Sequence, residues 1–396
     1  MQEVCHSIPN EVPCRTARRR ARTYTRRVID TVPTGFQSVG QPTARRIALS
    51  AVERGHNGRT LLVHGPSGAG KGAFVDDLLA LAFCTSAEPA GRPCNTCRGC
   101  RDARARTHPD LVVGSPELWR DERSTGESIV AAARRWLLEA AGAPVVGERR
   151  IVLVEHADRA NEQTQNALLK TLEEPTDRHT FILVADEPSR LLPTIRSRAQ
   201  PLRIGPVPRD ELVAHLMSVR RLPTDQAEAL ARIANGLAGR AVSYADRTDL
   251  IEWRRRLQAE LLDLLERGRA ERLGAVRDLL DEAARLEGPP AAGDVPGEGD
   301  DAPRTPASAQ RAAAAIIVEA WMALARDLLV AAAGSGETAP SAELAPEIGR
   351  LAERIGVPPM AAMVRLLERI HEGLRANASP RLALEAAMLA WPRLAR

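Results

Sequence analysis

A glycine-rich loop with one lysine is the segment of this sequence most suited to chemistry. Residues 65–72 read GPSGAGKG, close to the pattern G-x-x-x-x-G-K-[ST], in which backbone N–H groups surround phosphate oxygens and the hydroxyl binds Mg²⁺. Gly65, Gly68, Gly70 and Lys71 fit that loop, but Gly72 replaces the metal-binding hydroxyl. The sequence therefore predicts a phosphate-binding loop (P-loop) with ATP as a candidate ligand and with impaired hydrolysis.

A second group of residues stands where a nucleotide hydrolase needs acidic and polar side chains. A P-loop ATPase holds Mg²⁺ with a carboxylate at the end of a neighbouring strand and often polarises water with a second one. Glu155 stands in the metal position but is one methylene longer than aspartate, and His156 replaces the second carboxylate. His156 fits an ordinary histidine at a helix start equally well. Ala185 and Asp186 follow the next apolar run, where Thr or Asn would sense the γ-phosphate. We count Glu155 and Asp158 as vestigial nucleotide-binding candidates.

Four of the six cysteines lie close together in the sequence after the loop. Cys84, Cys94, Cys97 and Cys100 have the spacing C-x9-C-x2-C-x2-C, and two residues between thiolates allow one tight turn to direct both sulfurs at one ion. Four thiolates suit a closed, structural Zn²⁺ site, and a cytoplasmic location argues against disulfides. An iron–sulfur cluster and a set of unrelated thiols are the alternatives.

Composition limits the class of protein. The 396 residues include 55 basic and 51 acidic ones, and only two of the basic residues are lysines, Lys71 and Lys170. This arginine bias is more typical of a GC-rich genome than of a DNA-binding surface. Aromatic residues make up 3% of the chain, too few for the stacking platforms of a single-strand binder. No apolar run approaches the roughly 18–20 residues that cross a bilayer, and the arginine-rich start lacks the apolar stretch of a secretory signal, so we expect a soluble cytoplasmic protein.

The pattern of apolar residues predicts the elements that position these groups. Continuously apolar runs, which indicate strands, lie at 60–64, 110–113, 150–154 and 180–185. They alternate with helical patterns at 42–54, 73–79, 127–141 and 161–174. Strands of this kind separated by helices predict a parallel sheet covered on both faces. From about residue 208 the pattern is wholly helical, with a first group to about 247, a turn marked by Gly236 and Gly239, and longer helices at 249–286, 307–334 and 341–396.

Three segments make the sequence similar to a known family. They read EHADRAN at 155–161, NALLKTLEEP at 166–175 and LLPTIRSRA at 191–199. Together they resemble the delta-prime subunits of the bacterial clamp loader within DNA polymerase III holoenzyme. The four-cysteine module is shared by that family and its gamma/tau relatives. The resemblance is strong over about 36–245 and only architectural beyond.

The resemblance implies an AAA+ fold: an α/β P-loop domain with a parallel sheet, a small helical lid domain and an all-α collar domain. We accordingly expect the AAA+ domain at 34–207 with a zinc module inserted at 84–100, and the lid at 208–247. The arginine-rich segment 1–33 lacks hydrophobic periodicity and is predicted to be a disordered basic extension, or in part the product of a misplaced start codon. The collar would occupy 248–396, and its segment 287–306, rich in Gly, Pro, Ala and Asp, is predicted to be a flexible insertion.

The resemblance also implies partners and a role for an arginine. Family members join motor (gamma/tau) and delta subunits in a five-membered ring that loads the sliding clamp onto primer-template DNA, with no membrane involved. Their Ser-Arg-Cys motif presents its arginine to ATP on the adjacent motor subunit. Ser197 and Arg198 match this motif and Ala199 replaces the cysteine. A guanidinium offered in trans can stabilise γ-phosphate charge, whereas the alternative for Arg198 is a surface ion pair worth under about 1 kcal/mol.

Other polar residues in the matching region have weaker predictions. Lys170 and the pair Glu173 and Glu174 fit a solvated helix end as well as a contact to DNA or clamp. Arg240 falls where AAA+ proteins place a lid arginine, so contact with nucleotide is a hypothesis for it.

The favoured reading is a non-hydrolysing stator of the clamp loader that donates Arg198 to a neighbour, within a polymerase assembly whose polymerase active site is not in this chain. An active gamma/tau-like AAA+ ATPase and a stand-alone nucleic-acid-binding zinc protein are the alternatives.

Overall fold

The computed structural model describes residues 35–53, 60–88, 91–173, 178–286, 307–334, 344–375, 378–392 and 394. The predicted basic extension 1–33 and the predicted insertion 287–306 lie outside the described residues, as do Glu174, Pro175 and the two N-terminal cysteines.

Five parallel strands form one sheet in the order β2-β3-β4-β1-β5. The strands are β1 (Thr60–His64), β2 (Leu111–Gly114), β3 (Arg150–Val154), β4 (His179–Ala185) and β5 (Ala199–Arg203). The first four were predicted, but β5 was not, because its sequence AQPLR contains few apolar residues and a proline. Pro201 is tolerated because β5 is an edge strand that pairs only with β1.

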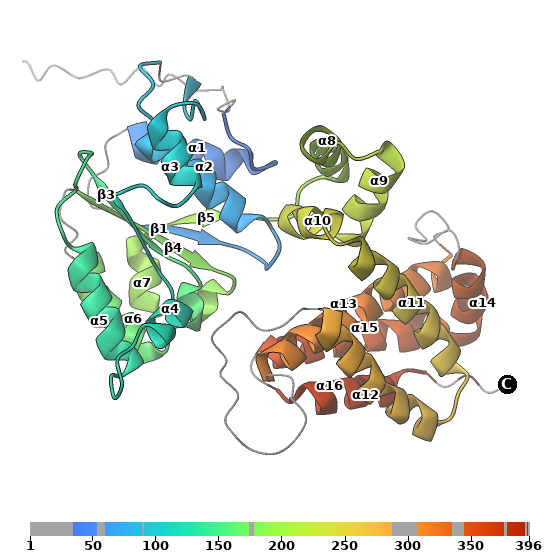
Figure 1. Cartoon of the computed structure of the whole chain (residues 1–396). Coiled ribbons are helices and arrows are strands. Elements are labelled where there is room, and N and C mark those ends of the chain that lie inside the picture. Colours follow the sequence, from blue (N-terminus) through green and yellow to red (C-terminus); the bar gives the residue numbers. More distant parts are fainter. Residues whose placement is uncertain are drawn as a thin grey trace, which may run out of the picture. The chain divides into compact units, whose positions relative to one another are not determined.

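Alternate residues of each strand enter two separate apolar cores. On β1, Leu61 and Val63 face one core while Leu62 faces the other, as the two-residue period of a strand requires. The first core is covered by α1 (Pro42–Glu53), α2 (Lys71–Phe83) and α3 (Arg98–Arg104). The second is covered by α4 (Pro116–Asp121), α5 (Ile129–Ala140), α6 (Glu162–Glu173) and α7 (Pro193–Arg198), so the helices lie on both faces of the sheet (Figure 1).

Polar side chains set the starts of several helices. Ser128 Oγ accepts the N–H of Ala131 at 3.2 Å at the start of α5, and Asn161 Oδ1 accepts the N–H of Thr164 at 2.8 Å before α6. These are N-cap contacts, which satisfy backbone donors that have no partner in the first helical turn. Asn161, predicted as the first residue of a helix, is therefore its cap.

The chain from residue 208 onward is helical, in shorter pieces than predicted. The helices are α8 (Arg209–Arg220), α9 (Thr224–Ile233), α10 (Ala238–Ala245), α11 (Thr248–Leu265), α12 (Arg269–Leu286), α13 (Ala307–Ala332), α14 (Ala345–Ile355), α15 (Val357–Arg375) and α16 (Pro380–Ala390). The predicted helix 249–286 is interrupted by the segment 266–268, and Gly356, with a φ of 78°, separates α14 from α15. Gly236 marks the turn before α10 as predicted, whereas Gly239 lies inside that helix.

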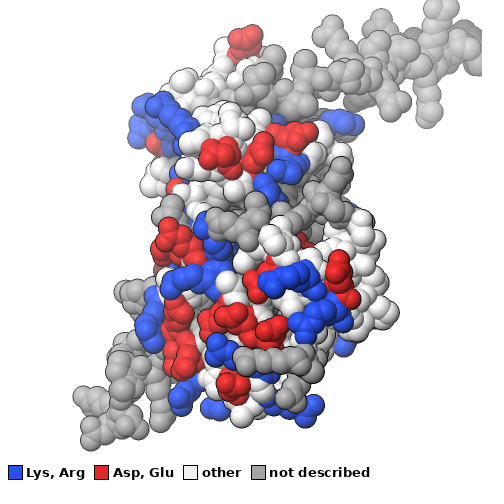
Figure 2. Space-filling model, turned by 90° about the vertical axis from the view of Figure 1, so that its right-hand side faces the viewer, with Lys and Arg blue, Asp and Glu red and all other residues white. Residues whose placement is uncertain are grey.

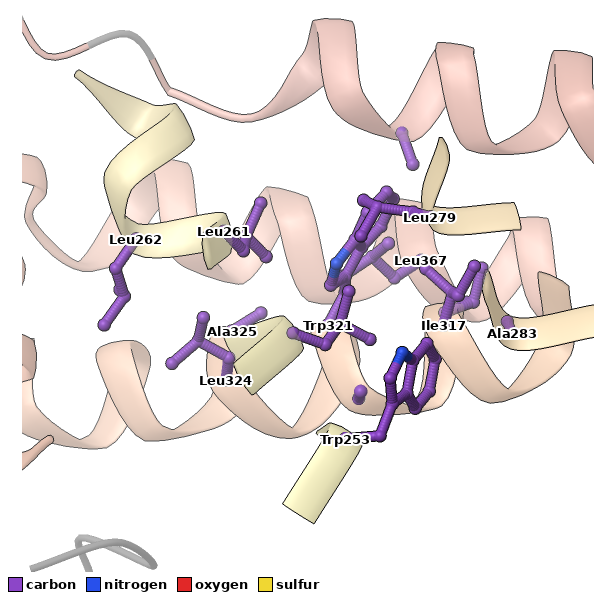
Figure 3. Packing of buried hydrophobic residues seen from close by; sticks show 14 of the residues in the cluster. Trp253, Leu261, Leu262, Leu279, Ala283, Ile317, Trp321, Leu324, Ala325 and Leu367 are labelled. Atoms are coloured by element: carbon purple, nitrogen blue, oxygen red, sulfur yellow. The ribbon is translucent and has the colours of Figure 1, made fainter. Parts of the chain in front are cut away.

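One apolar cluster runs through the helical part, from Leu212 to Leu394. Figure 3 shows its centre, where Trp253 and Leu261 of α11, Leu279 of α12, Trp321 of α13 and Leu367 of α15 pack together. Each of these side chains is at most 3% exposed. Within the described residues, no helix is both long enough and apolar enough to cross a membrane.

The predicted fold class, an α/β P-loop fold followed by helical regions, is confirmed. The predicted domain boundaries stay a prediction.

On the face drawn in Figure 2, basic and acidic side chains are interspersed, as expected from nearly equal numbers of the two.

Candidate functional site

The P-loop connects β1 to α2 and has the backbone that its glycines predict. Gly65 has a φ of 151°, and a Cβ at this residue would lie 1.9 Å from the carbonyl oxygen of Ile204, which follows β5. Gly70 precedes α2 with a φ of 94° in the left-handed region, which costs glycine little and other residues more. Both positions therefore require glycine for the chain to turn from the strand into the helix.

Lys71, the first residue of α2, points back into its own loop. Its side chain is buried, and Nζ donates to the carbonyl oxygens of Gly65 at 2.8 Å and Pro66 at 3.0 Å. The third partner is Asp186, whose Oδ1 lies 2.5 Å from Nζ. Because an ammonium has three N–H donors, all of its hydrogen-bonding capacity is used within the chain.

Gly72 leaves open space where the pattern requires a hydroxyl. A Cβ placed on this residue would have no heavy atom within 4 Å. The absence of Ser or Thr is therefore not imposed by packing.

Glu155 lies at the carboxyl end of β3 and is engaged by an arginine. Arg106 Nη1 donates to Glu155 Oε1 at 2.8 Å, and Arg106 Nε donates to Asp76 of α2 at 2.9 Å. Burial raises the pKa of Asp76 and the Arg106 charge opposes that rise. The Arg106 guanidinium thus balances the charge of Glu155, the carboxylate that would have to bind Mg²⁺. The sequence did not predict this contact.

Asp158 is buried in the 3₁₀ turn Ala157–Arg159 (η2) and holds the turn that follows β4. Its Oδ2 accepts the N–H groups of Asp186 at 3.1 Å and Glu187 at 2.8 Å. Its Oδ1 is buried with no hydrogen-bond partner among the described residues. Asp158 therefore fixes the backbone of Asp186, the residue that binds Lys71.

A pocket of about 100 Å³ lies beside the P-loop and was not predicted. Its lining is mostly apolar and comes from the segment before α1, the loop, α2, the residue after β5 and the helices α8 and α10; the residues include Val39, Gly70, Phe74, Ile204, His215 and Val242. Burial lowers the pKa of His215, and the charges of Arg220 and Arg45 lower it further.

The start of α10 packs directly on the P-loop. The backbone N–H of Arg240 donates to the carbonyl oxygen of Gly68 at 2.9 Å, and a Cβ on Gly239 would lie 3.0 Å from that same oxygen. The guanidinium of Arg240 pairs with Glu319 of α13, with Nη2 2.8 Å from Oε1. The arginine therefore contacts the loop through its backbone and α13 through its side chain.

The four predicted cysteines lie together at the far end of α2. Their Sγ atoms are all within 4.8 Å of one another, and Cys94 and Cys100 are 4.0 Å apart. Sulfurs around a tetrahedral Zn²⁺, with Zn–S distances of about 2.3 Å, are separated by about 3.8 Å. The cluster is therefore close to the size of a Cys₄ metal site, with Cys84 and Cys100 buried.

Backbone donors prepare the thiols of this cluster for a cation. The N–H groups of Cys94, Cys97 and Cys100 donate to the sulfurs of Cys84, Cys94 and Cys97 respectively, each at 3.4 Å. The backbone donor at Cys97, helped by Thr96, lowers the pKa of Cys94 to about 5. Burial raises the pKa of Cys100, which a bound divalent cation would reverse because a coordinating thiol is deprotonated.

A buried carboxylate ties the cysteine module to α2 and to the segment before α1. Asp77, fully buried in α2, accepts the N–H groups of Gln37 at 2.9 Å and Ser38 at 2.7 Å and pairs with Arg104 of α3 at 2.7 Å. Arg104 also donates to Asn95 Oδ1 at 2.9 Å within the module. One side chain on α2 therefore positions both the module and the segment that lines the pocket.

Ser197 and Arg198 form the exposed last turn of α7, directly before β5. Ser197 Oγ and Arg198 Nη1 each donate to the carbonyl oxygen of Thr194 at 3.0 Å. The side chains lie on the surface, where a residue offered to another chain must be. Lys170 is likewise exposed on α6.

Residues 40–208 match the family described as DNA polymerase III, delta subunit. The chain is 35% identical over 177 residues to DNA polymerase III subunit delta' of Pseudomonas aeruginosa, covering 45% of this chain and 52% of that protein. It is 34% identical over 198 residues to subunit delta' of Escherichia coli, covering 50% and 57%. It is also 32% identical over 177 residues to subunit gamma/tau of Mycobacterium tuberculosis, covering 44% and 29%.

The resemblance predicted from the residues is confirmed over that segment. The chain spans about half the length of the curated delta' subunits it matches.

Proposed function

We propose that this chain is a clamp-loader subunit of delta-prime type in DNA polymerase III holoenzyme, which does not itself hydrolyse ATP. It joins gamma/tau-like motor and delta subunits in a five-membered cytoplasmic ring that loads the sliding clamp onto primer-template DNA. The similarity of residues 40–208 to DNA polymerase III delta subunits supports the assignment.

The non-hydrolysing role is supported by one observation: the two groups that a hydrolytic site would need are already engaged by other groups of this chain. Lys71 is bound to Asp186 and two loop carbonyls, and Glu155 is bound to Arg106. A hydrolytic site needs the lysine on the outer phosphates and a carboxylate on Mg²⁺. With glycine at position 72, these groups favour a loop that holds phosphate weakly, through Gly65, Gly68, Gly70 and Lys71, without turnover.

The proposed contribution to catalysis is Arg198, donated to ATP on the adjacent motor subunit. Its place at the exposed end of a short helix, where Ser197 also bonds back to Thr194, suits a side chain that must reach another protein. Arginine is always charged and spreads its donors in a plane, which suits the developing charge on a γ-phosphate.

The test is ATP turnover by the reconstituted ring with Arg198→Ala. We expect ATP turnover at the motor site next to this chain to fall on the order of 10³-fold. The total ATP turnover of the ring should then fall by the share that this one site contributes. Arg196→Ala removes an exposed arginine from the same helix and serves as the matched control, with turnover unchanged. Equal turnover for both variants would remove the proposed role of Arg198.

The active gamma/tau-like alternative makes a different prediction for the isolated chain. An active motor would release phosphate from ATP by itself and lose that activity with Lys71→Met. We expect no turnover above background from the chain alone and no effect of that substitution.

For the cysteine cluster we propose structural Zn²⁺ held by Cys84, Cys94, Cys97 and Cys100. The inter-sulfur distances and the backbone donors to sulfur support a closed site. Bound zinc would offset part of the negative charge of the four thiolates and join the end of α2 to the start of α3. Elemental analysis of the purified chain should give about one zinc and no iron, whereas iron with labile sulfide would favour the cluster alternative.

A further inference from the structure

We propose that Asp186 is a built-in anion that occupies Lys71 in place of a ligand phosphate and selects against polyphosphates at the P-loop. This deepens the proposed non-hydrolysing role and concerns the same loop. It assigns to one residue, outside the P-loop pattern itself, the discrimination between ligands with and without phosphate groups.

The position of Asp186 follows from the sheet. It is the first residue after β4, and β4 pairs with β1, whose carboxyl end begins the P-loop. This brings Asp186 Oδ1 to 2.5 Å from Lys71 Nζ, with the two side chains only 18% and 9% exposed. The Coulombic attraction across so short and so shielded a contact is stronger than in a surface ion pair, because little water screens it.

The carboxylate is held there by its own surroundings. Asp158 accepts the backbone N–H of Asp186 at 3.1 Å, and Oδ2 of Asp186 lies 4.0 Å from Nη2 of Arg159. Asp186 therefore has a fixed backbone and a cation beside each of its oxygens. Asp158 is a positioning residue in this arrangement, since it acts through Asp186.

The consequence for a ligand depends on its charge. A phosphate group reaching Lys71 must displace the carboxylate or lie beside it, and two anions at this distance repel each other. The apolar pocket next to Gly70 carries no such carboxylate in its lining. The penalty therefore applies to the phosphates of a nucleotide and not to its base, and it increases with phosphate charge.

The first experiment measures the affinity of the full chain for ADP and for ATP by calorimetry without Mg²⁺, in the wild type and in Asp186→Asn. The amide keeps the shape of the carboxylate and removes its charge, so we expect affinity to rise about tenfold or more. Glu187→Gln removes the next carboxylate in the chain, which pairs with Arg190, and should change nothing. The double variant with Lys71→Met and Asp186→Asn should not show the increase in affinity for ADP and ATP that Asp186→Asn shows alone.

The result that would overturn the proposal is equal affinity in wild type and Asp186→Asn, including the case in which neither binds. A gain that persists in the double variant would also overturn it, because the effect would not pass through Lys71.

A second measurement does not depend on the folding of a variant. The chain contains only two lysines, so NMR spectra of the lysine-labelled wild type hold one side-chain signal from Lys71 and one from the exposed Lys170. We expect the Lys71 ammonium protons to exchange slowly with water and to show a nuclear Overhauser contact to the β-protons of Asp186. Fast exchange at both lysines, with no such contact, contradicts the proposal. Neither measurement involves Arg198 or the ring, so its failure is distinguishable from failure of the clamp-loader assignment.

Discussion

Among the described residues, the two ends of α2 carry the two candidate sites, and these differ in how complete their ligand sets are. At the amino end, Lys71 begins the helix but is bound to Asp186, and glycine replaces the neighbouring hydroxyl. At the carboxyl end, Cys84 follows the helix and joins three further cysteines whose sulfurs cluster closely enough for one metal ion. One end has lost members of its ligand set and the other has a full set.

This difference teaches that geometry and chemistry can be retained separately. The P-loop still has the backbone of a phosphate site, since Gly65 and Gly70 adopt the conformations that only glycine takes easily. Its lysine, however, is bound within the chain, to Asp186 and to two loop carbonyls. The cysteine cluster brings four sulfurs within 4.8 Å of one another, close to the size of one metal site.

The largest expected effect on stability comes from the cysteine cluster, at the carboxyl end of α2. Cys97→Ala should abolish stoichiometric zinc binding and lower the free energy of unfolding on the order of 5 kcal/mol, because three thiolates no longer close a tetrahedral site. Metal content and thermal unfolding of the purified variant measure this. Cys14→Ser, which removes a cysteine outside the cluster, is the matched control. Full zinc content in Cys97→Ala would contradict the four-thiolate site.

The next effect concerns the residue that joins the two ends. Asp77→Ala should destabilise the chain by about 3 kcal/mol, because it removes the only carboxylate paired with Arg104 among the described residues and the acceptor of the Gln37 and Ser38 N–H groups, of which Ser38 is buried. Asp76→Ala removes the adjacent, partly exposed carboxylate of the same helix and should cost about 1 kcal/mol or less. Chemical denaturation compares them, and equal losses would show that Asp77 has no special part in holding the module.

The smallest effect tests whether one residue accounts for the loss of catalysis. Gly72→Ser places a hydroxyl where space is open, so we expect the free energy of unfolding to change by no more than about 0.5–1 kcal/mol. ATP turnover by the isolated chain should stay at background, because Lys71 and Glu155 remain engaged by Asp186 and Arg106. Appreciable turnover in this variant would mean that the hydroxyl alone was missing.

The sequence predicted what depends on local pattern. Glycine spacing identified the loop, cysteine spacing identified the cluster, and apolar runs identified four of the five strands. β5 was missed because its polar residues and Pro201 fit an edge strand that only the finished sheet reveals. The predicted helix 249–286 was drawn as one element because the break at 266–268 is short and contains no proline. The helical pattern therefore continues on both sides of it.

Contacts between distant segments were beyond such reasoning. The pairs Lys71–Asp186 and Arg106–Glu155 join residues that are 115 and 49 positions apart in the sequence. Nothing in the sequence around either residue indicates its partner. The pocket beside Gly70 was missed for the same reason, because its lining comes from several separate segments.

Arg240 connects the P-loop to α13 of the helical part. Its amide is anchored on Gly68 and its guanidinium on Glu319, so a shift of the loop carbonyl pulls on α13, and a shift of α13 pulls on the loop. A single residue therefore couples the position of the P-loop to that of a helix about 80 residues further along the chain (319 minus 240 is 79).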